Sequence, residues 1–176
     1  MIAFLRFFGI MNAAVWFGAA VFFSFGIAPA FFTPEMKRLL GEIYAGLVAQ
    51  SVIERYFVLH YCCGGLALLH QLAEWVYLGK ALQRLTFGLL LAILTFSLLG
   101  GFWLQPKLKE LYRIRHGRAN QFTAEQKSDA ANSFRRWHEA SQIINLVMLA
   151  SLGLFAWRVS VPQQNGTRFT PGKFRG

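Results

Sequence analysis

Three side chains with metal-binding chemistry lie within or directly before long apolar stretches of the sequence. His60 and Cys63 are about one helical turn apart, and His138 stands where another apolar stretch begins. Imidazole nitrogen and thiolate sulfur suit copper, zinc or a haem iron. The same residues fit two further interpretations: polar contacts that only hold helices together, and a polar path for a solute or proton. The residues by themselves leave these three interpretations open.

More polar side chains share a face with these three. At about 100° per residue, one helix face carries Tyr56, His60, Cys63, Gly64, Ala67, Gln71 and Glu74. Another stretch carries His138, Ser141, Gln142 and Asn145 on one face. Strongly polar groups are costly against lipid, so both faces are predicted to turn toward protein. The candidate binding residues are Tyr56, Gln71, Glu74, Ser141 and Asn145, and the candidate metal ligands are His60, Cys63 and His138.

The composition indicates that lipid surrounds the elements carrying these residues. Of the 176 residues, 55% are hydrophobic and only 15% are charged, and 18 are Phe. A soluble domain has about 25% charged residues, and a chain of this length lacks the core volume to bury so much apolar surface. The mean hydropathy of +0.39 supports the same conclusion. A cytosolic enzyme and a secreted disulfide scaffold are therefore excluded.

Four apolar stretches are long enough to cross a bilayer as helices, which takes about 20 residues. They cover residues 7–30, 56–78, 85–104 and 139–157. The predicted fold is an all-α integral membrane four-helix bundle within residues 1–160, followed by a disordered basic tail at 161–176. Small residues four apart, Ala14 with Gly18 and Gly88 with Ala92, are predicted to let helices approach closely.

Two polar connections are predicted to be helical. An interfacial amphipathic helix starts at the cap Thr33 with Pro34 in its first position, and its apolar face carries Met36, Leu39, Leu40, Ile43 and Leu47. The segment 105–137 is a helical polar loop that breaks near Gly117. It restarts at the capping box of Thr123 and Gln126, from which one helix is predicted to run into the last apolar stretch.

The basic residues indicate an orientation rather than a nucleic-acid partner. The net charge is +10, but most Lys and Arg residues flank apolar stretches, where they meet lipid headgroups. The side with the 105–137 loop has 11 basic residues and the side with both termini has 7. We therefore predict a multi-pass protein of the inner membrane with that loop in the cytoplasm and the termini opposite. The predicted partners are the lipid bilayer and a helix-packing partner or second copy.

Several short motifs resemble those of a known family. They are the Trp103–Lys107 exit of the third stretch, the Phe134–His138 entry of the fourth with Ser141 and Asn145, and the Ala28–Phe32 exit of the first. Over about residues 7 to 158 the chain is similar to the bacterial domain-of-unknown-function 4149 family, which is related to eukaryotic transmembrane protein 205. The resemblance marks His138, Ser141 and Asn145 as motif positions of unknown role.

The resemblance implies a four-helix membrane protein without a settled activity. Its eukaryotic relatives are linked to tolerance of platinum drugs, and the wider grouping is thought to include copper-resistance proteins and a haem-dependent oxidase. The cofactor is unknown, with copper and haem as the candidates. The leading hypothesis is a non-enzymatic protein that binds or handles a small solute or metal ion within the bundle. The alternatives are a haem- or metal-dependent redox enzyme and a non-catalytic accessory subunit.

Overall fold

The computed structural model describes residues 2–78, 83–117 and 120–161, and the described residues are almost entirely helical. In chain order the elements are α1 (Ile2–Phe22), the π-helix η1 (Phe23–Ile27), α2 (Ala28–Ala30), α3 (Pro34–Leu78), α4 (Arg84–Leu99), the π-helix η2 (Gly100–Leu104), α5 (Gln105–His116) and α6 (Ala124–Ser160). Because α1, η1 and α2 are continuous, and α4, η2 and α5 are continuous, the elements form four long rods.

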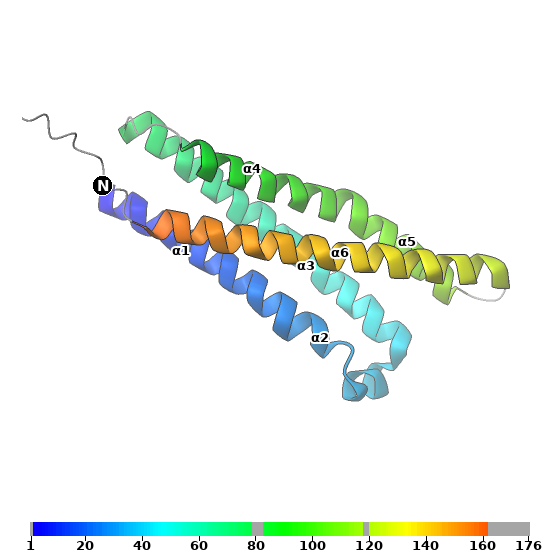
Figure 1. The fold of residues 1–176 in the computed structure, drawn as a ribbon. Helices are drawn as coiled ribbons and strands as arrows, with labels where there is room; N and C mark the ends of the chain where they lie inside the picture. Colours follow the sequence, from blue (N-terminus) through cyan, green and yellow to red (C-terminus); the bar gives the residue numbers. More distant parts are fainter. Residues whose placement is uncertain (1, 79–82, 118–119, 162–176) are drawn as a thin grey trace, which may run out of the picture.

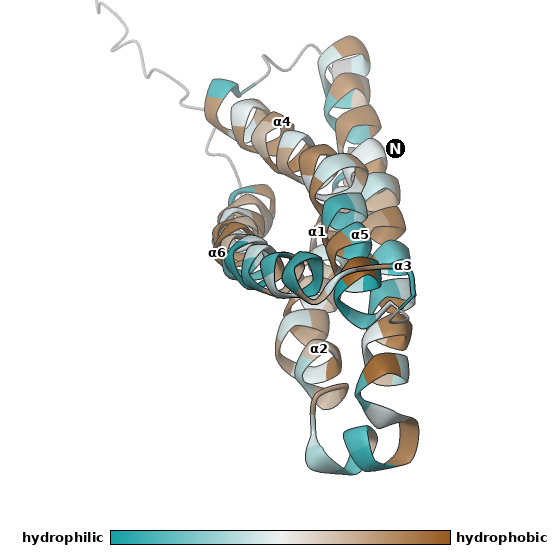
Figure 2. Ribbon diagram, turned by 90° about the vertical axis from the view of Figure 1, so that its right-hand side faces the viewer, coloured by the Kyte–Doolittle hydropathy of each residue, from teal (hydrophilic) through white to brown (hydrophobic). Residues whose placement is uncertain are grey.

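The four rods run up and down as an antiparallel bundle (Figure 1). The start of α1 and the ends of α3 and α6 lie at one end of the bundle, and the α5–α6 connection lies at the other. Each rod is long and apolar enough to cross a membrane. The predicted all-α four-helix membrane bundle is thus confirmed. Hydrophilic residues gather on α5 and on the part of α6 beside it (Figure 2), as predicted for a helical polar loop.

Few large side chains are buried between the rods, and the outer surface of the bundle is apolar. The fully buried large side chains are Trp16, His60, Leu90, Ile93, Leu152 and Ser97. Many large apolar residues on every rod are exposed, Phe102 and Tyr77 among them. Such a surface is stable only in lipid, where apolar side chains need no protein cover.

The helix predicted to start at Thr33 is interrupted. Thr33 caps it as expected, since its Oγ1 accepts a hydrogen bond from the backbone N–H of Met36 at 3.4 Å. At Gly41, however, φ is 73° and ψ is 158°, a backbone conformation essentially restricted to glycine. The prediction of one continuous amphipathic helix was therefore wrong: Met36 and Leu39 lie before the kink, and Ile43 lies after it.

Replacing Gly41 with Ala is expected to lower the free energy of unfolding by about 2 kcal/mol, because a Cβ is strained at this φ and ψ. Thermal unfolding in detergent measures the change. Gly18→Ala is the control, since its φ is not positive and a Cβ there meets nothing within 4 Å. Equal melting temperatures for the two variants would contradict the assigned kink.

The break between α5 and α6 lies where the sequence indicates it. The α5 helix ends at His116, and α6 starts after a capping box in which Gln126 N–H bonds Thr123 Oγ1 at 3.2 Å and Thr123 N–H bonds Gln126 Oε1 at 2.9 Å. As predicted, α6 then runs without interruption to Ser160. The predicted disordered tail, apart from Val161, lies outside the described residues.

Two π-helical turns were not predicted, although each has a sequence signal. A proline ring clashes with the carbonyl of the residue four positions earlier and cannot bond to it. For Pro29 that residue is Phe25, the centre of η1, and for Pro106 it is Phe102, the centre of η2. In both places the helix widens so that the N–H just before the proline bonds the carbonyl five residues back, from Ala28 to Phe23 and from Gln105 to Gly100.

Candidate functional site

His60 is the polar centre of the buried core. Its side chain is completely buried, and its Nδ1 accepts a hydrogen bond of 2.7 Å from Trp16 Nε1 on α1. The rings of His60 and Tyr56 pack edge to face, with their centroids 4.3 Å apart. The predicted inward face of α3 is confirmed, since its members from residue 56 to 67 are all buried: Tyr56, His60, Cys63, Gly64 and Ala67.

The bond from Trp16 fixes the protonation of His60. An indole N–H can only donate, so Nδ1 must carry a lone pair and the proton of the neutral imidazole must be on Nε2. His60 Nε2 is buried and has no hydrogen-bond partner in the described part of the chain. A buried donor without a partner costs about 1–3 kcal/mol, which makes the Nε2–H group ready to bind an acceptor.

A second set of polar contacts lies next to His60. Tyr56 donates to Asn145 Oδ1 at 3.3 Å, and Asn145 Nδ2 donates to Ser24 Oγ at 2.8 Å. Phe23 stacks on Tyr56 with a centroid distance of 4.0 Å. Ser24 and Phe23 both belong to η1, so the π-turn caused by Pro29 supplies two side chains to this network. The network thereby joins α3, α6 and η1 near His60.

The three candidate metal ligands are not brought together. Cys63 is buried beside α1, where its backbone carbonyl accepts a bond of 2.9 Å from Asn12. His138 instead stacks on Phe134 and lies 3.3 Å from the Gln142 amide. No group of three or more His, Cys, Asp or Glu side chains that could hold a metal ion occurs among residues 2–78, 83–117 and 120–161.

The hydrogen bonding of His60 is also unsuited to a metal or haem iron. A metal-bound histidine normally donates its second ring N–H to an acceptor, which orients the ring and raises its basicity. Here the second nitrogen, Nδ1, faces the donor of Trp16. Metal binding through Nε2 would require either an imidazolate or the loss of the Trp16 bond. His60 and Trp16 therefore do not fit a bound metal ion or haem iron.

The remaining predicted residues have separate surroundings. Gln71 is half-buried, and its Nε2 has no partner among the described residues. Glu74 is also half-buried, one turn further along α3. Ser141 donates back to the His138 carbonyl at 2.6 Å and does not join the network around Asn145. His70, on the same helix, has its Nε2 2.8 Å from the Leu5 carbonyl oxygen of α1.

Sequence reasoning found His60, Tyr56 and Asn145 but missed their partners. Trp16 and Ser24 lie in the first apolar stretch, where hydropathy does not distinguish them from the residues around them. Trp16 does follow Asn12 by four residues, which places both polar groups on one face of α1. For Ser24 the signal is the proline five residues later, because it implies a widened turn.

The sequence of this chain matches a known protein family. The model of the family described as Domain of unknown function (DUF4149) matches residues 11–117, which is more than half of the chain. The chain belongs to the DUF4149 family. Comparisons with curated proteins and with solved structures gave no match.

The DUF4149 match covers only part of the site. It includes Trp16, Ser24, Tyr56 and His60, whereas Asn145 lies beyond its end at residue 117. The resemblance noted from the sequence extended further, to about residue 158. The motif positions His138 and Ser141 therefore also lie outside the matched segment.

Proposed function

We propose that this DUF4149 protein binds a small hydrogen-bond-accepting solute inside its helix bundle, beside His60. The observation that carries the proposal is the buried Nε2–H of His60, whose direction of bonding is fixed by Trp16. An acceptor such as a carbonyl or carboxylate oxygen removes the cost of the unpaired donor. A cation gains nothing from this group.

A second unpaired donor on the same helix supports an acceptor as the ligand. Gln71 Nε2 is buried without a partner in the described residues and lies about 16 Å further along α3. Within the apolar stretch 56–78 of α3, the two buried polar atoms without a partner among the described residues, His60 Nε2 and Gln71 Nε2, are thus both nitrogen donors. A solute with acceptor oxygens finds favourable positions at two depths of one inward face, which fits binding or passage along it.

The orientation in this proposal follows the basic residues. The loop end of the bundle, with α5 and the start of α6, faces the cytoplasm of the inner membrane. Of the 18 basic residues 11 are on this side, and Lys and Arg are retained on the cytoplasmic side during insertion. Solute released at the His60 end of the inward face is then closest to the cytoplasm.

Native mass spectrometry of the full chain extracted in mild detergent tests the proposal. The wild type is expected to carry a small-molecule adduct that His60→Leu binds at least tenfold more weakly, because one hydrogen bond to a buried donor is lost. His60→Gln, which keeps a donor, is expected to retain part of the adduct. Thr95→Val is the control, because Thr95 is exposed and its hydroxyl donates within its own helix to the Leu91 carbonyl at 2.8 Å.

Two outcomes would contradict the proposal. One is a wild-type protein without any small-molecule adduct, and the other is an adduct that His60→Leu retains in full. Either result would leave the polar residues as contacts that hold the helices together.

A further inference from the structure

A pocket lies at the loop end of the bundle, between α3 and α5 and away from His60. Its volume is about 590 Å³, within the range of small-ligand sites. The α3 wall is formed by Ile43, Leu47 and Gln50, and the α5 wall includes Lys109 and Arg113. Ile43 and Leu47 are each 46% exposed. The pocket therefore combines an apolar wall with a charged one.

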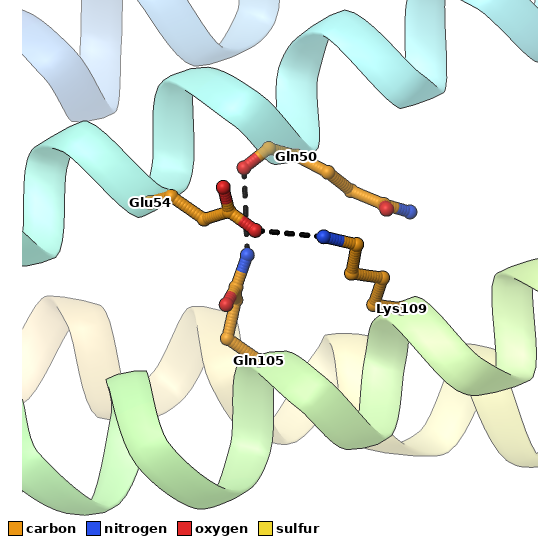
Figure 3. A network of polar contacts seen from close by, with 4 residues as sticks. All are labelled: Gln50, Glu54, Gln105 and Lys109. Atoms are coloured by element: carbon orange, nitrogen blue, oxygen red, sulfur yellow. Dashed lines mark hydrogen bonds and ion pairs between the residues drawn. The ribbon is translucent and has the colours of Figure 1, made fainter.

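The pocket contains an acceptor without a donor. Gln50 Oε1 is buried and has no hydrogen-bond partner in the part of the chain that the structure describes. Two neighbouring polar groups are engaged elsewhere, since Gln105 Nε2 donates to the Gln50 backbone carbonyl at 3.4 Å and Lys109 pairs with Glu54 at 2.8 Å. His116 Nε2, which also belongs to the pocket lining, is likewise buried without a partner among the described residues. Figure 3 shows the Gln50 side chain extending away from Glu54. A ligand of this pocket needs a hydrogen-bond donor at Gln50.

The charges around the pocket are mixed rather than purely basic. Lys109 is bound to Glu54, and Arg113 is bound to Glu110 at 2.8 Å. Glu110 itself lines the pocket. A ligand with only negative charge would lie against this carboxylate. A ligand with one negative and one positive group can place its anion near Lys109 and Arg113 and its cation at Gln50.

The position of the pocket along the bundle coincides with the headgroups of the lipid. Lys109 is five residues beyond Leu104, the predicted end of the third apolar stretch, which is about 8 Å along a helix. The headgroup layer extends about 5–8 Å beyond the hydrocarbon on each side. The charged wall is therefore at headgroup level.

We propose that the α3–α5 pocket binds a membrane phospholipid with a zwitterionic headgroup that carries N–H donors, as phosphatidylethanolamine does. Its ammonium group donates to Gln50 Oε1, its phosphate lies near Lys109 and Arg113, and the start of an acyl chain covers Ile43 and Leu47. Phosphatidylcholine has the same charges but no N–H group, so it cannot bond Gln50. This site is separate from His60, and the two proposals can fail independently.

The test adds phosphatidylethanolamine, phosphatidylcholine and phosphatidylglycerol with identical acyl chains to the detergent-solubilised full chain and counts bound lipids by native mass spectrometry. The wild type is expected to prefer phosphatidylethanolamine over phosphatidylcholine by about tenfold, the effect of one hydrogen bond to a charged group. Gln50→Leu is expected to abolish this preference. Gln142→Leu, the same change at an exposed position of α6, is expected to preserve it.

A second variant keeps the test decisive if Gln50→Leu does not fold. Gln50→Glu retains an acceptor and adds a negative charge, so it is expected to keep or increase the preference for phosphatidylethanolamine. Free phosphoethanolamine at millimolar concentration is expected not to displace the lipid, because it lacks the acyl chain. The proposal is overturned by equal binding of phosphatidylcholine to the wild type, by stronger binding of phosphatidylglycerol, by a preference that survives Gln50→Leu, or by displacement with free phosphoethanolamine.

Discussion

Replacing Trp16 with Phe is expected to lower the free energy of unfolding by about 3 kcal/mol, most of it through His60. The change removes the N–H that bonds Nδ1 at 2.7 Å and leaves a second buried polar atom without a partner. It also leaves part of the space of the indole empty, and Trp16 is completely buried against Phe155 and His60. Reversible unfolding in mixed micelles measures the loss.

A spectroscopic measurement separates this effect from simple packing. In the wild type, nitrogen NMR of labelled histidine is expected to show His60 as the Nε2–H tautomer only, because Trp16 occupies Nδ1. In Trp16→Phe the two tautomers are expected to mix. Trp157→Phe is the matched control, since Trp157 is 62% exposed on α6 and is expected to cost less than about 0.5 kcal/mol. Equal losses for both variants, or an Nδ1–H tautomer in the wild type, would refute the assignment.

Replacing Gly64 with Leu is expected to cost about 3 kcal/mol or to prevent folding, whereas the same change at the neighbouring Gly65 is tolerated. A Cβ at Gly64 would overlap Leu94 of α4 and come within 3.2 Å of the Trp16 ring, so a Leu side chain there forces α1, α3 and α4 apart. A Cβ at Gly65 meets nothing within 4 Å. Because leucine favours a helix over glycine by about 1 kcal/mol, Gly65→Leu is expected to be neutral or stabilising.

The pair of variants is compared by thermal unfolding in the same detergent. Since residues 64 and 65 are adjacent, the substitutions share their depth in the membrane and their effect on hydropathy. The two positions differ only in their surroundings, because other helices lie against Gly64 and not against Gly65. Comparable stability of the two variants would mean that α3 does not present Gly64 to Trp16 and Leu94.

The sequence was sufficient to determine which residues share a face of a helix and where α6 starts. Helical periodicity placed Tyr56, His60 and Cys63 on one face, and the cost of polar groups in lipid turned that face inward. The capping box of Thr123 and Gln126 fixed the start of α6, because its two bonds form between residues three apart. These features depend on neighbours in the chain, so the sequence alone predicts them.

The pairing between helices was decided only by the tertiary structure. Trp16 and His60 are 44 residues apart, and nothing local in the sequence indicates that they meet. The predicted close contacts at Gly18 and Gly88 do not form among the described residues of the chain, since a Cβ at either position meets none of their atoms within 4 Å. Gly64 and Gly46, by contrast, lie against side chains of other helices. His138 stacks on Phe134 of its own helix rather than approaching His60 and Cys63.

The physical reason is the solvent. In water a helix reveals its packing face because that face is the apolar one. In a bilayer the lipid-facing and helix-facing sides of a rod are both apolar, so hydropathy cannot tell which small or aromatic residue will find a partner. Polar residues are the exception, because lipid excludes them. For this reason the sequence placed His60 and Asn145 in the interior, while the packing of the rods determined that Trp16 and Ser24 would bind them.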